Sequence, residues 1–301
     1  MKNNNEKFKE YNRQLFKDYK KSLKHMIFDE TLTLYILRPI AFIIVKLLYS
    51  TNVTPNQVSY TAIFVGLISA FFFSMGTLTS FLIGGILYFF ILVLDCVDGM
   101  IARLKKNGTP VGRIIDGFAD YSIGILIYIG MGMGLDKGIV PIEFPISHWW
   151  LLVIASISHI IHAMLVDYYR GEFMAHGLGR DTSTWEANEK FNNELAEIKH
   201  EKGRIFDKFL IALYLGYSRL QLFKLKEKEI FNKDQYFQKN QLLIKLWFWI
   251  GPTAHIFALI IAAILFRPGI YFIYTIGVAN IYMIILWIIQ VKVNKKIIVN
   301  N

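Results

Sequence analysis

The sequence contains a single cysteine among 301 residues, and charged residues make up only 19% of the chain. One cysteine, Cys96, excludes an internal disulfide and a zinc site built from several cysteines. Hydrophobic residues account for 54%, and the mean hydropathy of +0.39 is too high for a soluble domain of this length. The first 30 residues are polar and rich in lysine, so no cleavable signal sequence is expected there. The composition therefore indicates an integral membrane protein.

Six apolar stretches are each close to the roughly 20 residues that a helix needs to cross a bilayer. They are residues 57–77, 80–103, 111–134, 146–169, 242–266 and 270–291. Residues 31–50 are a seventh apolar segment, but a charge deep in the bilayer costs at least about 2.5 kcal/mol, and this segment carries Arg38 and Lys46. We therefore predict an all-α integral membrane protein with six transmembrane helices, and a further helix that lies in the membrane interface.

The distribution of basic residues predicts how these helices are oriented. With six spans and both termini in the cytoplasm, the external loops hold only Lys137 and Arg267 of the 33 lysines and arginines. This arrangement satisfies the positive-inside rule, whereas a span at residues 31–50 would violate it. The net charge of +10 is then expected to face anionic lipid and not nucleic acid. The prediction is a protein of the cytoplasmic membrane.

The chain divides into four predicted parts. Residues 1–50 are expected to form N-terminal amphipathic and interfacial helices, because apolar residues recur every three or four positions among lysines. Residues 51–170 hold the first four transmembrane helices, which form the core. Residues 171–240 are polar and contain 12 lysines and arginines, so we expect a cytoplasmic helical insertion. Residues 241–301 hold the last two transmembrane helices and a short tail.

Four aspartates, Asp95, Asp98, Asp116 and Asp120, lie within the predicted second and third transmembrane helices. Charged side chains are costly at such depth and are candidates for function by default. Asp95 and Asp98 are three residues apart, and Asp116 and Asp120 are four apart, so each pair shares one helix face. The helix rise places the two pairs at a similar depth, where cations are needed to offset their repulsion. Four carboxylates of this kind favour Mg²⁺ or Mn²⁺ and can hold two such ions.

Small residues and an arginine surround these aspartates in the sequence. Gly99, Ala102 and Gly112 each lie one helical turn from an aspartate, which allows a ligand to approach the backbone closely. Glycines at such spacing also suit simple helix packing. Arg103, at the cytoplasmic end of its helix, has the fork geometry that binds a phosphate, and Asn56 lies at the cytoplasmic start of the first span. Together these residues indicate a nucleotide or pyrophosphate site that faces the cytoplasm.

The combined pattern resembles the signature of the CDP-alcohol phosphotransferases, also called CDP-alcohol phosphatidyltransferases. It reads Asp95-x2-Asp98-Gly99-x2-Ala102-Arg103-x8-Gly112-x3-Asp116-x3-Asp120. The start of the first span is similar to that family as well, with Ser59 in place of the usual threonine. The resemblance covers roughly residues 31–170. It implies a six-helix membrane enzyme, often a homodimer, that transfers a phospho-alcohol from a CDP-alcohol to a second alcohol and releases CMP.

The resemblance also implies a role for individual residues. All four aspartates would bind two divalent metal ions, and Asp120, beside Asp116 in the catalytic pair, would be the general base. The residues that would surround the CDP group are Asn56, Gly99, Ala102, Arg103 and Gly112. Arg170 resembles a basic residue of members that accept phosphorylated polyols, but Glu172 replaces a second basic residue usual there. Arg170 either binds an acceptor phosphate or extends to the membrane interface.

Other functions fit part of this pattern. The same fold could use a CDP-amino-alcohol donor and a diacylglycerol acceptor. An intramembrane prenyltransferase also holds Mg²⁺ and diphosphate between aspartates, but Asp95 and Asp98 do not have the spacing of its second motif. A cation transporter could use the aspartates as an ion path, which leaves Arg103 and the glycines unexplained. The favoured prediction is transfer of a phosphatidyl group from CDP-diacylglycerol to a hydrophilic alcohol.

Overall fold

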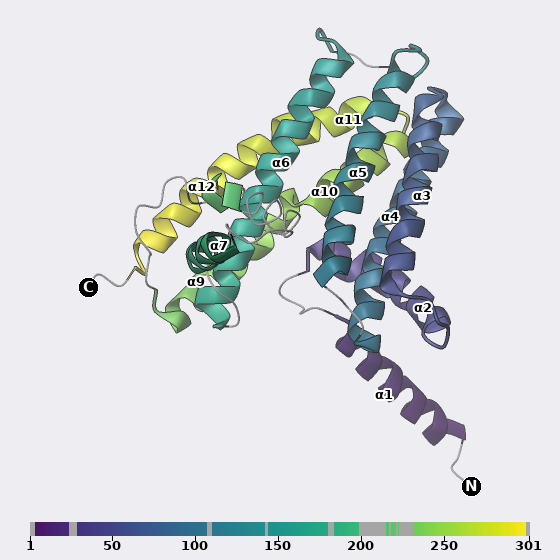
Figure 1. Ribbon diagram of the computed structural model, residues 1–301. Helices are drawn as coiled ribbons and strands as arrows, with labels where there is room; N and C mark the ends of the chain where they lie inside the picture. The colour runs from purple at the N-terminus through teal and green to yellow at the C-terminus, as the bar shows by residue number, and fades with distance from the viewer. Residues whose placement is uncertain are drawn as a thin grey trace. The chain divides into compact units, whose positions relative to one another are not determined.

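The computed structural model is helical, without strands, over the residues that it describes (Figure 1). These are residues 4–23, 29–106, 110–141, 144–179, 184–198 and 231–298, with a few residues between 215 and 222. Only the backbone is described for residues 4–12, 110–119, 121, 187, 191, 194 and 198. Asp116 and Gly112 are therefore placed by their backbone alone.

The chain begins with a helix, α1 (Asn4–Ser22), and continues through a π-helical turn, η1 (Thr33–Leu37), into α2 (Arg38–Leu48). Three long helices follow: α3 (Pro55–Ser74), α4 (Leu78–Lys105) and α5 (Pro110–Leu135). Capping explains where α3 begins, because the Gln57 backbone N–H donates to Thr54 Oγ1 while Gln57 Oε1 accepts from the Thr54 N–H. The helices η1 and α2 show that residues 31–50 are largely helical, as predicted. Their position in the membrane interface stays a prediction.

The second half of the chain is also built from helices. Helix α6 (His148–Glu172) continues as a π-helical segment, η2 (Phe173–Leu178), and α7 (Thr184–Ile198) follows. The last elements are α9 (Lys233–Trp247), a 3-10 turn η3 (Phe248–Ile250), α10 (Pro252–Ile264), α11 (Pro268–Phe272), η4 (Ile273–Val278) and α12 (Ala279–Lys295). Most of residues 199–230 of the predicted helical insertion, 171–240, lie outside the described residues, and the insertion's cytoplasmic location stays a prediction.

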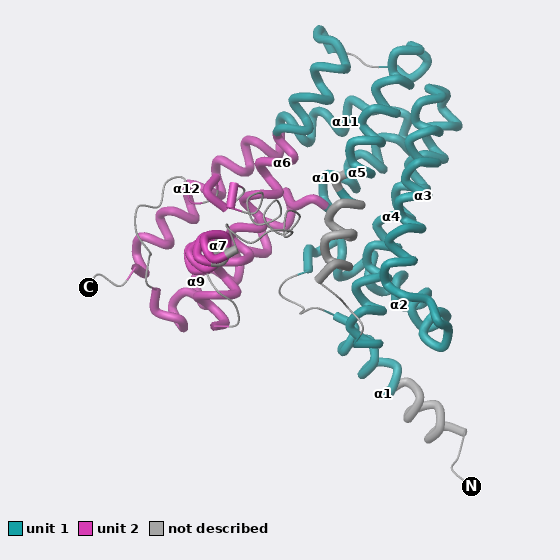
Figure 2. Tube along the Cα trace, viewed as in Figure 1, with its two compact units in different colours: residues 1–157, 253–277 teal, residues 158–252, 278–301 magenta. Residues whose placement is uncertain are grey.

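The chain forms two compact units (Figure 2). The first comprises residues 1–157 and 253–277, and in it α3 packs against both α4 and α5. Glycines permit the close contact of α3 with α5. A Cβ on Gly130 would lie 2.3 Å from the backbone oxygen of Ala70, and one on Gly134 would lie 2.0 Å from that of Phe73. The two helices meet so closely because α5 presents no side chain at these points.

The second unit comprises residues 158–252 and 278–301, and α9 packs there against η2 and α12. The ring of Tyr169 stacks on that of Trp247 with centroids 4.8 Å apart. The buried side chain of Gln290 accepts a hydrogen bond from Trp247 Nε1 at 3.2 Å and donates one to Asn240 Oδ1. Polar side chains thus join α9 to α12 inside this unit.

Among the residues that the structure describes, five helices are long and apolar enough to cross a membrane. They are Pro55–Ser74, Leu78–Lys105, His148–Leu178, Lys233–Ile264 and Pro268–Lys295. These correspond to five of the six predicted spans, although the one predicted at 242–266 begins nine residues earlier. The sixth, predicted at 111–134, coincides with α5, whose described side chains give a shorter apolar helix, Ser122–Leu135. That span, and the orientation of all of them, stay predictions.

Candidate active site

Asp98 is held in a buried position where α3 and α4 meet. Its side chain is only 5% exposed, and Ser59 Oγ donates a hydrogen bond of 2.7 Å to its Oδ2 atom. Ser59 is in the second turn of α3, and the packing of α3 on α4 brings the two residues together. Asp95, one turn earlier in α4, is half-buried. The first predicted pair of carboxylates therefore lies on the protein side of α4, as the helical spacing predicts.

The second predicted pair is described only in part. Asp120 is exposed on α5, while the side chain of Asp116 lies outside the described set and Gly112 is placed by its backbone alone. Among the side chains that are described, no three His, Cys, Asp or Glu residues form a group that could hold a metal ion. Asp116 is absent from that comparison, so the predicted cluster of four carboxylates and the two-metal site remain predictions.

The guanidinium group of Arg103 folds back over Gly99. A Cβ on Gly99 would lie 3.3 Å from Arg103 Nη2, so the space that glycine leaves is used by this arginine. Arg103 Nε donates to the backbone oxygen of Ser22 at the end of α1. Ala102, on the same helix, and Asn56, at the start of α3, are half-buried. Gly99 thus leaves room beside the guanidinium group of Arg103, and the roles of both residues in binding CDP stay predictions.

Arg38 is a residue of this region whose contacts the sequence did not reveal. Its side chain is buried, and Arg38 Nη2 donates to Asp29 Oδ1 at 2.9 Å. Burial lowers the pKa of Arg38. The interactions with Asp29, Cys96 and Asp95 together outweigh burial, so the pKa of Arg38 is raised above its ordinary value. In the sequence, Arg38 stands out as an arginine before a proline inside an apolar segment, and together with Lys46 it argues against a span there.

Arg170 and Glu172 lie in the second unit, on α6. Arg170 Nη2 donates to Asp167 one turn earlier on the same helix, so the arginine is already paired within its own helix. Glu172 is buried, and its carboxylate accepts from the Thr184 backbone N–H at 2.8 Å and lies 3.1 Å from His176 Nε2. An acidic residue at position 172 therefore secures the start of α7. A basic residue there could not accept these hydrogen bonds.

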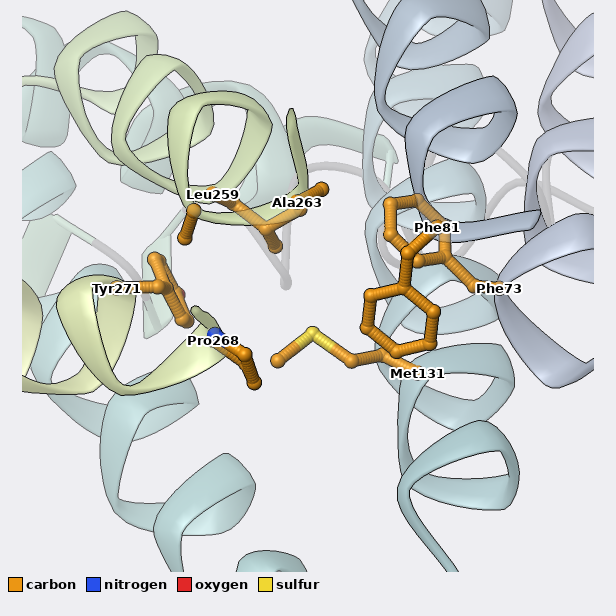
Figure 3. Close-up of a pocket in the computed structure, with 8 residues that line it drawn as sticks. Phe73, Phe81, Met131, Leu259, Ala263, Pro268 and Tyr271 are labelled. Atoms are coloured by element: carbon orange, nitrogen blue, oxygen red, sulfur yellow. The ribbon is translucent and has the colours of Figure 1, made fainter. Parts of the chain in front are cut away.

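A narrow apolar crevice lies at the other end of the first unit (Figure 3). It is lined by Phe73, Phe81, Met131, Leu259, Ala262, Ala263, Pro268 and Tyr271. Phe81 and Asp98 are about 25 Å apart along α4 at 1.5 Å per residue. The crevice has no charged lining residue and is remote from the aspartates, so it does not belong to the candidate site.

The observations define a helical membrane protein that gathers carboxylates and arginines at one end of its first unit. Residues 52–184 match the model of the CDP-alcohol phosphatidyltransferase family, the family that the signature resembles. One similar protein is a "Bifunctional IPC transferase and DIPP synthase" from Thermococcus kodakarensis (strain ATCC BAA-918 / JCM 12380 / KOD1). The two are 30% identical over 128 residues, which cover 40% of this chain and 26% of that relative. The chain thus matches only about a quarter of the relative's length.

Proposed function

We propose that this protein is a CDP-alcohol phosphotransferase that moves a phosphatidyl group from CDP-diacylglycerol to the hydroxyl group of an acceptor and releases CMP. The observation that carries this proposal is the complete signature inside the family match, with its Asp98 buried and oriented by Ser59. The family match favours this function over a prenyltransferase or a cation transporter, which share only part of the pattern.

The donor set fits a divalent metal ion. Carboxylate oxygens are hard ligands, and Asp98 accepts a hydrogen bond that fixes the direction of its carboxylate, as supporting partners of metal ligands do. In the proposal, Asp95, Asp98, Asp116 and Asp120 hold two Mg²⁺ or Mn²⁺ ions. When bound, these ions would offset the negative charge that grows on the CMP leaving group.

The protein's own residues then bind the substrates and move one proton. Arg103 donates hydrogen bonds to phosphate oxygens of the donor, next to Asn56, Gly99, Ala102 and Gly112. The acceptor oxygen forms a bond to the phosphatidyl phosphorus while the bond from that phosphorus to the CMP oxygen breaks. Asp120 takes the proton of the acceptor hydroxyl as general base, and its exposure on α5 suits a group that must meet a second substrate.

We also propose where the reaction occurs. In the proposal, the ends of α3 and α4 that carry Asn56 and Arg103 face the cytoplasm, and the water-soluble part of CDP reaches the site from there. The distribution of basic residues supports this orientation. A homodimer is proposed by analogy with the family.

Release of CMP by the purified protein in lipid nanodiscs tests the function. The protein would be incubated with Mg²⁺ and either labelled CDP-diacylglycerol, with hydrophilic alcohols and their phosphates, or labelled CDP-ethanolamine with diacylglycerol. CMP formed from CDP-diacylglycerol, with a new phospholipid seen by mass spectrometry, is the expected result. CMP formed only from CDP-ethanolamine would establish the CDP-amino-alcohol alternative. No CMP from either donor would reject both.

A further inference from the structure

Helix α2 packs against α4, and this packing brings Arg38 of α2 within electrostatic range of Arg103 of α4, although the two residues are far apart in the sequence. Both guanidinium groups also interact electrostatically with Asp29, Arg38 with Asp95, and Arg103 with Asp98. Two positive side chains thus lie within electrostatic range of the carboxylates of α4, in the first unit of the chain.

The ion pair of Arg38 with Asp29 leaves several of its polar atoms without a partner. Only Arg38 Nη2 and Asp29 Oδ1 are joined, at 2.9 Å. Within the described part of the chain, the buried atoms Arg38 Nε, Arg38 Nη1 and Asp29 Oδ2 have no hydrogen-bond partner. Arginine and carboxylate commonly form two parallel hydrogen bonds, and buried polar groups are rarely left unsatisfied. Because Arg38 is only 7% exposed, solvent does not readily supply the missing partners.

Arg103 shows the same feature and also contacts a partial negative charge. Its Nη2 atom is buried without a hydrogen-bond partner among the described residues. Its Nε atom donates to the carbonyl oxygen of Ser22 at the C-terminal end of α1, where a helix carries partial negative charge. The side chain as a whole is half-buried, so the pair of arginines is not sealed inside the protein.

We propose that Arg38 and Arg103 together bind one phosphate group of a substrate, and that Asp29 positions Arg38 for this contact. Arg38 Nε, Arg38 Nη1 and Arg103 Nη2 are three donor nitrogen atoms. Phosphate oxygens accept hydrogen bonds from arginine guanidinium groups of this kind. The inference rests on the proposed function, in which the phosphate belongs either to the diphosphate of the CDP donor or to a phosphorylated acceptor. Arg38 is then a substrate-binding residue from outside the family signature.

The test measures how strongly the full-length protein binds probes with and without phosphate, at constant Mg²⁺. CDP and cytidine report the donor phosphates, and inorganic phosphate added to protein saturated with CMP reports an acceptor phosphate. Arg38→Gln is expected to weaken one phosphate-carrying probe by about tenfold or more, because hydrogen bonds to charged groups are lost, while cytidine binding is unchanged. A loss with CDP identifies the donor, and a loss with inorganic phosphate identifies the acceptor. Arg267→Gln removes an exposed arginine of the same unit and should change none of these affinities.

Two further variants separate phosphate binding from a purely structural ion pair. Arg38→Lys keeps the charge but loses the fork, so it should weaken the same probe without abolishing binding. Asp29→Asn keeps the shape but removes the charge that holds Arg38 in place, so it should weaken the same probe, though less than Arg38→Gln does. Two ratios are measured for each protein: the affinity for CDP divided by that for cytidine, and the affinity for inorganic phosphate divided by that for CMP. General destabilisation does not shift either ratio. The proposal is overturned if both ratios in Arg38→Gln equal those of the unchanged protein; if Arg38→Gln does not fold, Arg38→Lys is judged in the same way.

This test also distinguishes failure of the inference from failure of the proposed function. CMP release from CDP-diacylglycerol by the unchanged protein tests the transfer reaction. Arg38-dependent phosphate binding without any CMP release would refute the proposed function alone. CMP release with phosphate binding that is independent of Arg38 would refute only the inference.

Discussion

The hydrogen bond from Ser59 to Asp98 offers a sharp test of how the site is held together. Ser59→Ala removes the donor and leaves Asp98 Oδ2, in a residue that is 5% exposed, without the 2.7 Å hydrogen bond. Ser59→Thr is the matched control, because threonine keeps the hydroxyl group and is the residue that the family usually has at this position. The pair of variants therefore separates the loss of the hydroxyl from a change of residue in the second turn of α3.

The magnitude follows from the surroundings of the hydrogen bond. A hydrogen bond to a charged group contributes about 1.5–3 kcal/mol to stability in a soluble protein. Hydrogen bonds between membrane helices contribute less, about 0.6 kcal/mol on average and at most about 1.7 kcal/mol, because the unfolded helices find other partners in the bilayer. Since Asp98 is buried and its partner lies on another helix, we expect Ser59→Ala to lower the free energy of unfolding by about 1–2 kcal/mol.

The effect on function should be larger than the effect on stability. Removing the group that orients a metal ligand typically costs about 10–100-fold in metal affinity or activity. We therefore expect Ser59→Ala to raise the Mg²⁺ concentration needed for half-maximal CMP release, or to lower kcat, by at least about tenfold. Ser59→Thr should stay close to the unchanged protein. A Ser59→Ala protein with the same thermal midpoint and the same Mg²⁺ dependence as Ser59→Thr would refute the reasoning.

Three further predictions concern the metal ions, the division of roles among the aspartates and the helix packing. Chelation with EDTA should abolish CMP release and added Mg²⁺ or Mn²⁺ should restore it; activity that survives chelation would contradict the two-metal proposal. Asp120→Asn should abolish turnover and largely keep CDP binding measured by calorimetry, whereas Asp95→Asn should also lose metal-dependent binding; equal losses would exclude separate roles. Gly130→Ala should destabilise the protein by about 1–3 kcal/mol in thermal unfolding, because its Cβ would lie 2.3 Å from a carbonyl oxygen of α3. Gly124→Ala is the control, since nothing lies within 4 Å of its Cβ, and equal midpoints for the two variants would argue against this account of the packing.

The sequence predicted the membrane helices well because hydropathy reports directly on the bilayer. A chain that crosses a membrane must satisfy its backbone within continuous apolar helices, so the spans appear as long apolar runs. Hydropathy is less informative about where a helix ends. The helix predicted to leave the membrane at residue 169 continues as η2 to Leu178, because charged and polar side chains such as Glu172 find partners inside the protein. The span predicted to begin at residue 242 likewise starts with α9 at Lys233.

The sequence also identified the residues of the signature, because their spacing along single helices fixes which of them share a face. It determined the candidate aspartates, the neighbouring Arg103 and the membrane environment in which a charged cluster requires a function. Contacts between helices could not be obtained in this way, because helical spacing says nothing about which face of another helix lies opposite. The hydrogen bond of Ser59 with Asp98, and the electrostatic interaction of Arg38 with Arg103, depend on how α2, α3 and α4 pack. Only the tertiary structure decided these interactions, since a side chain's partners are set by distances through space that the order of residues does not contain.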